Sequence, residues 1–182
     1  LNYESGYVNG KSVSKIDLAS FTEMKKIEIG INPTRIATDG TNVYALSMGD
    51  YGETPSSIYK IDANDQAVNT GKGASWMAIH NGVLYTINSV FNPDWSTTDY
   101  YISYKLSDMS VLSDNFLGDK KVDAPAGIAI DTVGGQLFVS SYNLEGGYAS
   151  YTTDGYVNQY DLTGKLIKKY DVGVGPCYML VL

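Results

Sequence analysis

The sequence predicts an all-β fold made of repeated antiparallel sheets, because two patterns in its 182 residues agree. First, one short motif recurs at intervals of 41 to 51 residues, at Pro33–Ala37, Ala74–Ala78, Pro125–Ala129 and Pro176–Leu180. Second, the stretches between its copies are short apolar–polar alternations bounded by Gly, Asn, Asp or Pro, which is the pattern of strands and turns. No segment has the period of an amphipathic helix. Repeats of this length are typical of the blades of a β-propeller.

Each full copy divides into four predicted strands, which would form one antiparallel blade. The copy over 33–71 has strands at 35–38, 43–47, 58–62 and 66–70. The copy over 74–118 has strands at 77–79, 83–88, 101–106 and 110–117. The copy over 125–173 has strands at 127–130, 136–142, 156–162 and 166–172. We therefore expect a single β-propeller domain over residues 1–182.

The two ends of the chain supply the parts of a fourth blade. Residues 1–5, 12–18 and 24–30 match the second, third and fourth strands of a blade, and Tyr178–Leu182 matches the first. Pairing of the two ends would close the ring and remove exposed sheet edges, so this blade is expected over 1–30 and 176–182. Two interpretations stay open: a closed ring of four blades, or the C-terminal part of a larger propeller.

Several short motifs follow one another in the order of a known repeat: Val13–Asp17, Ile27–Gly30, Pro33, Asp39-Gly40 and Val43–Ala45. Together they resemble the YVTN β-propeller repeat, which is related to the YncE-like and surface-layer propellers of bacteria. The resemblance covers nearly the whole chain. The second copy departs from it most, at Ala74 in place of proline, His80 in place of aspartate, and Ser107 where Asp62 would recur.

The resemblance implies properties that the residues alone do not show. Such propellers commonly have seven blades, are mostly exported, and in many cases bind or scaffold other proteins without catalysis. On this basis we expect a non-catalytic protein-binding propeller of the bacterial surface or periplasm. An auxiliary lipoprotein subunit of an outer-membrane nutrient-uptake complex is one such protein.

Composition excludes some classes of partner. The formal net charge of −7 and the sequence pI of about 4.5 argue against nucleic acid, because phosphate binding needs a basic surface. No apolar run reaches the roughly 20 residues that span a bilayer. The 16 Tyr against 4 Phe suit sheets in which a ring packs while its hydroxyl stays in water. Cys177 is the only cysteine, so an intrachain disulfide is excluded, and we expect it to be buried in the last strand.

Asp39, His80 and Asp131 occupy the same position in three copies. Because the first strands of propeller blades line the central axis, these side chains are weak candidates for a ring of metal ligands. Turn chemistry is the favoured interpretation, since Asp and Asn accept backbone N–H groups in hairpins such as Asp39-Gly40. We therefore predict no metal and no cofactor.

Catalytic machinery is not predicted. His80 is the only histidine, and no G-x-S-x-G elbow accompanies it, which argues against a nucleophilic triad. The carboxylate pairs Asp50–Glu53 and Asp94–Asp99 fit solvated loops better than a general acid–base pair. A lyase or hydrolase with an axial metal stays the weakest of the alternatives.

The loops between the second and third strands are longer than a hairpin needs, and such loops are often functional. They cover 49–56, 89–100 and 143–155, with 4–11 as the fourth. Equivalent loops leave a propeller on one face, so their aromatic residues form the predicted binding face: Tyr51, Phe91, Trp95, Tyr100, Tyr148 and Tyr151. We expect this face to bind another protein, and the alternative is that it binds a glycan or a peptide. A competing interpretation packs these rings into the seams between blades.

Overall fold

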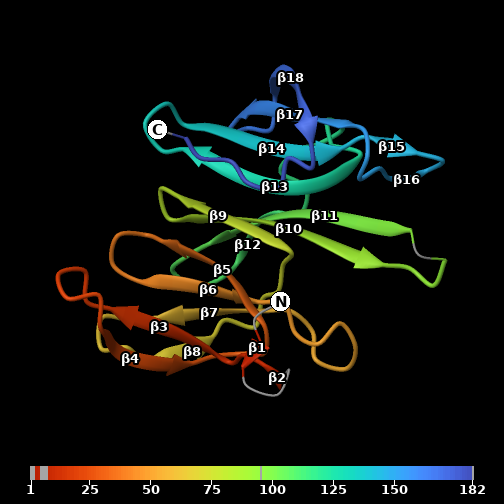
Figure 1. The fold of residues 1–182 in the computed structure, drawn as a ribbon. Coiled ribbons are helices and arrows are strands. Elements are labelled where there is room, and N and C mark those ends of the chain that lie inside the picture. The colour runs from red at the N-terminus through yellow and green to blue at the C-terminus, as the bar shows by residue number, and fades with distance from the viewer. Residues whose placement is uncertain (1–2, 5–7, 95, 182) are drawn as a thin grey trace. The chain divides into compact units, whose positions relative to one another are not determined.

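The computed structural model of the protein describes residues 3–4, 8–94 and 96–181, and every regular element among them is a β-strand. The all-β prediction is therefore confirmed, and this part of the chain contains no helix long and apolar enough to cross a membrane. The residues form two compact units, an N-terminal unit over 1–77 and a C-terminal unit over 78–182. Figure 1 shows that the strands of each unit pair into antiparallel sheets.

The N-terminal unit contains one complete four-stranded sheet. Its strands pair antiparallel in sequence order: β5 (Pro33–Thr38), β6 (Val43–Ser47), β7 (Ser57–Ile61) and β8 (Ala67–Asn69). A two-stranded sheet of β3 (Ser12–Ile16) and β4 (Glu23–Glu28) precedes it in the chain. A short hairpin of β1 (Tyr3–Glu4) and β2 (Val8–Asn9) comes before that.

The two larger sheets of the N-terminal unit meet at an apolar seam that an ion pair closes. The buried residues of this seam are Ile27, Ile29, Ala45 and Ile61. Asp65, in the turn between β7 and β8, reaches the β3–β4 hairpin, where its carboxylate lies 2.8 Å from Lys15 Nζ and 3.6 Å from Lys25 Nζ. The turn of one sheet is thereby held against the preceding sheet.

Two four-stranded sheets make up the C-terminal unit. The first pairs β9 (Trp76–His80), which spans the division between the units, with β10 (Val83–Phe91), β11 (Thr97–Lys105) and β12 (Val111–Ser113). The second pairs β13 (Ala124–Asp131), β14 (Gln136–Tyr142), β17 (Asp154–Asp161) and β18 (Leu166–Val174). Between β14 and β17 the chain adds a small hairpin of β15 (Leu144–Glu145) and β16 (Tyr148–Ala149).

Buried tyrosines hold the connection between the two sheets of the C-terminal unit. The Tyr160 hydroxyl donates to the Lys120 carbonyl at 2.6 Å and accepts from Asn158 Nδ2 at 2.9 Å. The Tyr156 hydroxyl donates to Asp123 Oδ2 at 2.7 Å and accepts from the Asp123 N–H at 2.9 Å. Burial raises the pKa of Tyr160 to about 12, so its hydroxyl stays protonated and keeps donating at neutral pH. Part of the tyrosine-rich composition is thus explained by these connections.

The three complete copies fold into four-stranded sheets close to the expected limits, but the first copy differs. β1 pairs with β2 and not with β3, so Tyr3–Glu4 does not form the expected second strand of that blade. The local hairpin closes a much shorter loop than the predicted pairing and therefore costs less chain entropy. β12 also ends at Ser113, before the predicted 117, because Phe116 and Leu117 leave the strand and pack as buried side chains.

The expected closing strand at the C-terminus is not found, since residues 178–181 form no strand. Two features just before it oppose strand pairing: Gly175 has a φ of 68°, and Pro176 has no N–H to donate to a ladder. Cys177, expected inside a buried strand, is half-buried, and its Sγ lies 2.8 Å from the Tyr142 hydroxyl. Closure of a ring is therefore not shown.

Candidate functional site

The aligned metal candidate of the N-terminal unit is a turn residue. Asp39 Oδ1 accepts from the N–H groups of Asn42 at 2.7 Å and Thr41 at 2.9 Å, and Oδ2 accepts from the Tyr44 hydroxyl at 3.1 Å. Slight burial acts to raise the pKa of Asp39, but these hydrogen bonds outweigh it and lower the pKa to about 2. The carboxylate is therefore occupied in stabilising the β5–β6 hairpin.

Of the two equivalent positions in the C-terminal unit, Asp131 behaves in the same way and His80 does not. Asp131 Oδ1 accepts from the N–H groups of Gly134 and Val133, both at 2.9 Å, and these bonds lower its pKa. His80 is the buried last residue of β9. Among the described residues, no group of three or more His, Cys, Asp or Glu side chains is placed to hold a metal ion.

Aspartates also build the turns between third and fourth strands. The aspartate after the third strand, or at its end, accepts N–H groups two to four residues further along; these are Asp17, Asp62 and Asp161. In the copy where Ser107 replaces this residue, Asp108 accepts from the Ser110 N–H at 2.9 Å. The departure from the repeat is thus compensated one residue later. Much of the acidic charge of the chain is explained by its turns.

The loop at 49–56 presents an exposed ring in a fixed conformation. Asp50 Oδ1 accepts from the N–H groups of Gly52 and Thr54, both at 2.9 Å. Tyr51 is 65% exposed and has a φ of 60°, a left-handed backbone that bulky residues rarely adopt. The loop therefore holds the predicted Tyr51 outward, and Asp50 acts as a turn residue.

The predicted loop at 89–100 is largely a two-stranded ribbon. β10 and β11 pair without a break along nine residues each. At the tip, the Asn92 N–H donates to the Ser96 carbonyl at 2.9 Å, and the Ser96 hydroxyl donates to Asp94 Oδ1 at 2.6 Å. Trp95, one of the six predicted aromatics, lies outside the described residues. The ribbon gives its other aromatics a regular backbone.

Phe91 and Tyr100 lie on opposite faces of this ribbon. In the β10–β11 register, Phe91 shares a face with Tyr101, whereas Tyr100 lies on the other face. Tyr101 is buried, and Tyr156 and Tyr160 of β17 are close enough to act on its hydroxyl, so the Tyr101 face lies toward the second sheet of the unit. The structure therefore separates Tyr100 from Phe91, although the sequence analysis assigned both to one patch.

A half-buried carboxylate lies on the same face of the ribbon as Phe91. Asp99 accepts a hydrogen bond from the Ser89 hydroxyl, the residue opposite it in the register. Burial raises the pKa of Asp99, against the opposing effects of the Ser89 hydrogen bond and the Lys121 charge. A positive charge placed near Asp99 would stabilise the ionised form of its carboxyl group.

The third loop contains the β15–β16 hairpin, which sequence reasoning did not predict. Its turn is Gly146-Gly147, with φ values of 60° and 89° that suit a tight hairpin. Tyr148 is 56% exposed on β16, and Tyr151 is 71% exposed just after it. The Tyr151 ring meets the Tyr142 ring edge-on, with centroids 4.9 Å apart.

We call Phe91, Tyr148 and Tyr151 the hairpin aromatics. All three belong to the C-terminal unit and are more than half exposed, so the interpretation that they are buried in seams is wrong. Figure 1 shows that the β10–β11 and β15–β16 hairpins extend from their sheets toward the same side of this unit. Three of the six predicted residues are therefore candidates for one surface.

Comparison with known proteins adds no relative. No protein-family model matches the chain, and a search of curated proteins finds no match. The resemblance to the YVTN repeat therefore stays an expectation that depends on the motifs quoted above.

Proposed function

We propose that the chain is a non-catalytic binding protein that docks another protein through the hairpin aromatics. The observation that carries this proposal is the exposure of three large rings, between 56% and 71%, of which Phe91 and Tyr148 lie on paired hairpin strands and Tyr151 packs against Tyr142 just after β16. Rings that are ordered before association lose little conformational freedom on binding, so they are effective anchors. Single exposed apolar residues are ordinary on protein surfaces, but a group of aromatic rings on neighbouring hairpins favours an interface.

The negative charge of the chain indicates the chemistry of the proposed partner. Asp99 lies on the Phe91 face with a pKa raised mainly by burial, and the chain as a whole carries a net charge of −7. A basic side chain near the edge of an apolar patch would pair with Asp99, and a basic surface would be steered toward the acidic chain. We therefore propose a partner whose contact surface is apolar with basic residues around it.

We further propose that the repeated sheets are consecutive blades of a β-propeller at the bacterial surface or in the periplasm. Support comes from three four-stranded antiparallel sheets, the recurring turn aspartates and the resemblance to YVTN repeats. A lipid-anchored auxiliary subunit of an outer-membrane nutrient-uptake complex is the specific setting that we propose. Fractionation of the native host with an antibody against the chain tests this location, and recovery only from the cytoplasm contradicts it.

Affinity capture with matched variants tests the binding surface. The test variant is Phe91→Ser/Tyr148→Ser/Tyr151→Ser, and the control variant, Leu18→Ser/Phe21→Ser/Val133→Ser, changes three residues of similar or greater exposure elsewhere. We expect the unmodified chain and the control to capture the same protein from the native host. The test variant should capture at least about tenfold less, because hot-spot rings each contribute more than about 1 kcal/mol.

Two results would contradict the protein-binding proposal. Equal loss of capture in both variants would show that the hairpin aromatics are not special. Retention of the partner by the test variant would place the interface elsewhere. Binding to a glycan array that the test variant loses, without any captured protein, would instead support glycan binding by the hairpin aromatics. Thermal unfolding of each variant checks that the sheets remain intact.

A further inference from the structure

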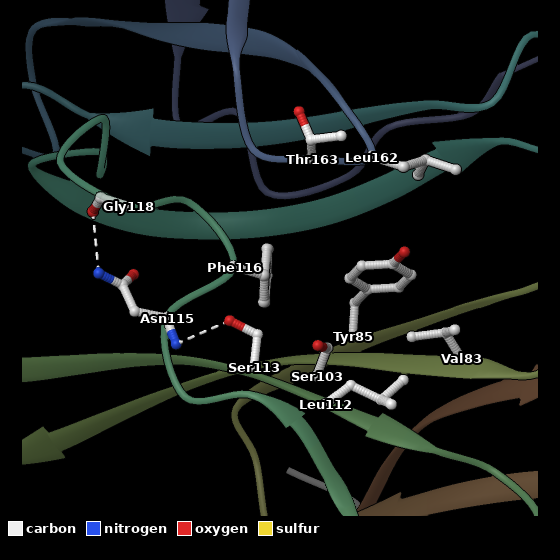
Figure 2. Close-up of a pocket in the computed structure, with 10 residues that line it drawn as sticks. All are labelled: Val83, Tyr85, Ser103, Leu112, Ser113, Asn115, Phe116, Gly118, Leu162 and Thr163. Carbon is white, nitrogen blue, oxygen red and sulfur yellow. Dashed lines mark hydrogen bonds between the residues drawn. The ribbon is translucent and has the colours of Figure 1, made fainter.

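A pocket lies at the other end of β10 from the hairpin aromatics. It is an open pocket with a volume of about 340 Å³, and it lies between the first sheet of the C-terminal unit, the segment after β12, and the turn between β17 and β18 (Figure 2). Val83, the first residue of β10, lines it, whereas Phe91 is the last residue of the same strand. At about 3.3 Å per residue, the two ends are about 26 Å apart. The pocket is therefore separate from the proposed protein-binding surface.

Aromatic packing and a close backbone contact shape the pocket in advance. The Phe116 ring meets the Tyr85 ring edge-on at 5.3 Å and the Tyr101 ring edge-on at 6.0 Å. The turn beside the pocket rests on the same segment, because a Cβ on Gly164 would lie 2.0 Å from the Phe116 carbonyl oxygen. Figure 2 shows Leu162 and Thr163 of this turn on the opposite side of the pocket from Ser103 and Leu112.

Two hydroxyl groups in the pocket wall have no hydrogen-bond partner among the residues that the structure describes. Tyr85 is 7% exposed and Ser103 is 4% exposed, and both line the pocket. No residue in the part of the chain that the structure describes gives either hydroxyl a hydrogen bond. Neither oxygen is among the fully buried unpaired polar atoms of the described residues, so both are reached from the open pocket. These hydroxyls are therefore available to bond to a ligand in the pocket.

The corresponding seam of the N-terminal unit shows what the pocket lacks. There the turn between third and fourth strands supplies Asp65, which pairs with Lys15 and Lys25 of the preceding sheet. In the C-terminal unit the equivalent turn supplies Leu162 and Thr163, and no charged side chain lines the pocket. An ionic ligand would lose its hydration without gaining a counter-charge, so the occupant is neutral.

We propose that this pocket binds the ring of one neutral sugar unit. A sugar ring has an apolar face, which would pack against Phe116, Leu112 and Leu162, and hydroxyl groups, which would bond to Tyr85 and Ser103. A purely aliphatic ligand would leave both protein hydroxyls unpaired. The volume suits a single ring, either free or at the end of a longer glycan. The inference goes beyond protein docking and does not depend on it.

Saturation-transfer NMR with simple sugars tests the proposal. The neutral probes are the methyl pyranosides of glucose, galactose and mannose, the charged probe is glucuronate, and the apolar probe is cyclohexanol. We expect at least one neutral pyranoside to bind and to bind more tightly than either control. Tyr85→Phe and Ser103→Ala each remove one hydroxyl and keep the wall, so each should weaken binding about five- to tenfold.

A variant whose pocket is filled by a larger side chain gives the decisive comparison of sugar binding. Leu112 lines the pocket but is 54% exposed, so Leu112→Trp can occupy the space without disturbing the core; Leu180→Trp makes the same change at a residue that is 81% exposed and does not line it. Sugar binding should be lost in Leu112→Trp and kept in Leu180→Trp and in the hairpin triple variant. Binding by no neutral sugar, persistence in Leu112→Trp, or loss in the triple variant would each overturn the assignment.

Discussion

At the scale of single residues, glycines decide how closely the sheets of the C-terminal unit approach. Gly164 has a φ of 86°, and a Cβ there would lie 2.0 Å from the Phe116 carbonyl oxygen. Gly40 has a nearly identical φ of 88°, but a Cβ there would meet nothing within 4 Å. The two positions therefore share one backbone requirement and differ in packing.

Substitution by alanine should lower the stability of the protein by different amounts at Gly40 and at Gly164. Gly40→Ala should destabilise the protein by about 1 kcal/mol, which is the cost of a left-handed backbone for a residue with a Cβ. Gly164→Ala should cost about 3 kcal/mol or more, because the β17–β18 turn must also move away from Phe116. Urea unfolding of both variants measures the difference. Equal costs would show that the turn does not rest on the Phe116 segment.

At the scale of elements, the tyrosine hydroxyls predict where the connection between sheets can be weakened. Tyr160→Phe removes the bonds to the Lys120 carbonyl and Asn158 Nδ2 in a buried setting, so it should cost about 1–2 kcal/mol. Tyr170→Phe removes an exposed bond to Gln159 Oε1 and should change stability by less than about 0.5 kcal/mol. Chemical denaturation compares the two. A Tyr160→Phe variant as stable as Tyr170→Phe would contradict the role of the Tyr160 hydroxyl in connecting the two sheets.

Most strands could be predicted from sequence, whereas the polar end of the β10–β11 ribbon and the short β15–β16 hairpin could not. β6 (Val43–Ser47) and β14 (Gln136–Tyr142) have the predicted bounds, because their buried side chains produce an apolar pattern. The ribbon beyond Ser89 carries polar residues such as Thr97 and Thr98, so it resembled a loop. The β15–β16 hairpin was not predicted, although its turn, Gly146-Gly147, is a pair typical of tight hairpins.

The candidate sites were less predictable than the strands, because they depend on register and on distant contacts. The sequence marks Phe91 and Tyr100 as loop aromatics, but only the strand register shows that they lie on opposite faces. Tyr85 and Ser103 belong to predicted strands and resembled ordinary core residues. The sequence shows no sign that the turn at Leu162 and Thr163, far later in the chain, leaves a pocket beside them.

At the scale of the whole molecule, turn aspartates in both units make stability depend on acidity. Hydrogen bonds lower the pKa values of Asp17, Asp39, Asp50, Asp94, Asp108, Asp131 and Asp161. A carboxyl group with a lowered pKa in the folded state contributes stability above its unfolded pKa of about 3.9 and loses it as the pH falls toward the folded value.

Thermal unfolding at several pH values tests this dependence. We expect a nearly constant midpoint from pH 7 to about 4 and a fall from there to about 2, where Asp39 itself becomes protonated. Asp39→Asn keeps an acceptor oxygen but cannot titrate, so its midpoint should fall less over the same range. A midpoint that stays level or rises below pH 4 would contradict the role of the turn carboxylates.

Site-directed photo-cross-linking in the native host tests the proposed binding surface most directly. A photoreactive phenylalanine analogue replaces Phe91, Tyr148 or Tyr151 in turn, and Val133, which is 97% exposed on the turn between β13 and β14, serves as the control position. The proposal predicts that one partner protein is linked from all three hairpin positions and not from Val133. Linkage from Val133 alone, or equally from all four positions, would contradict it.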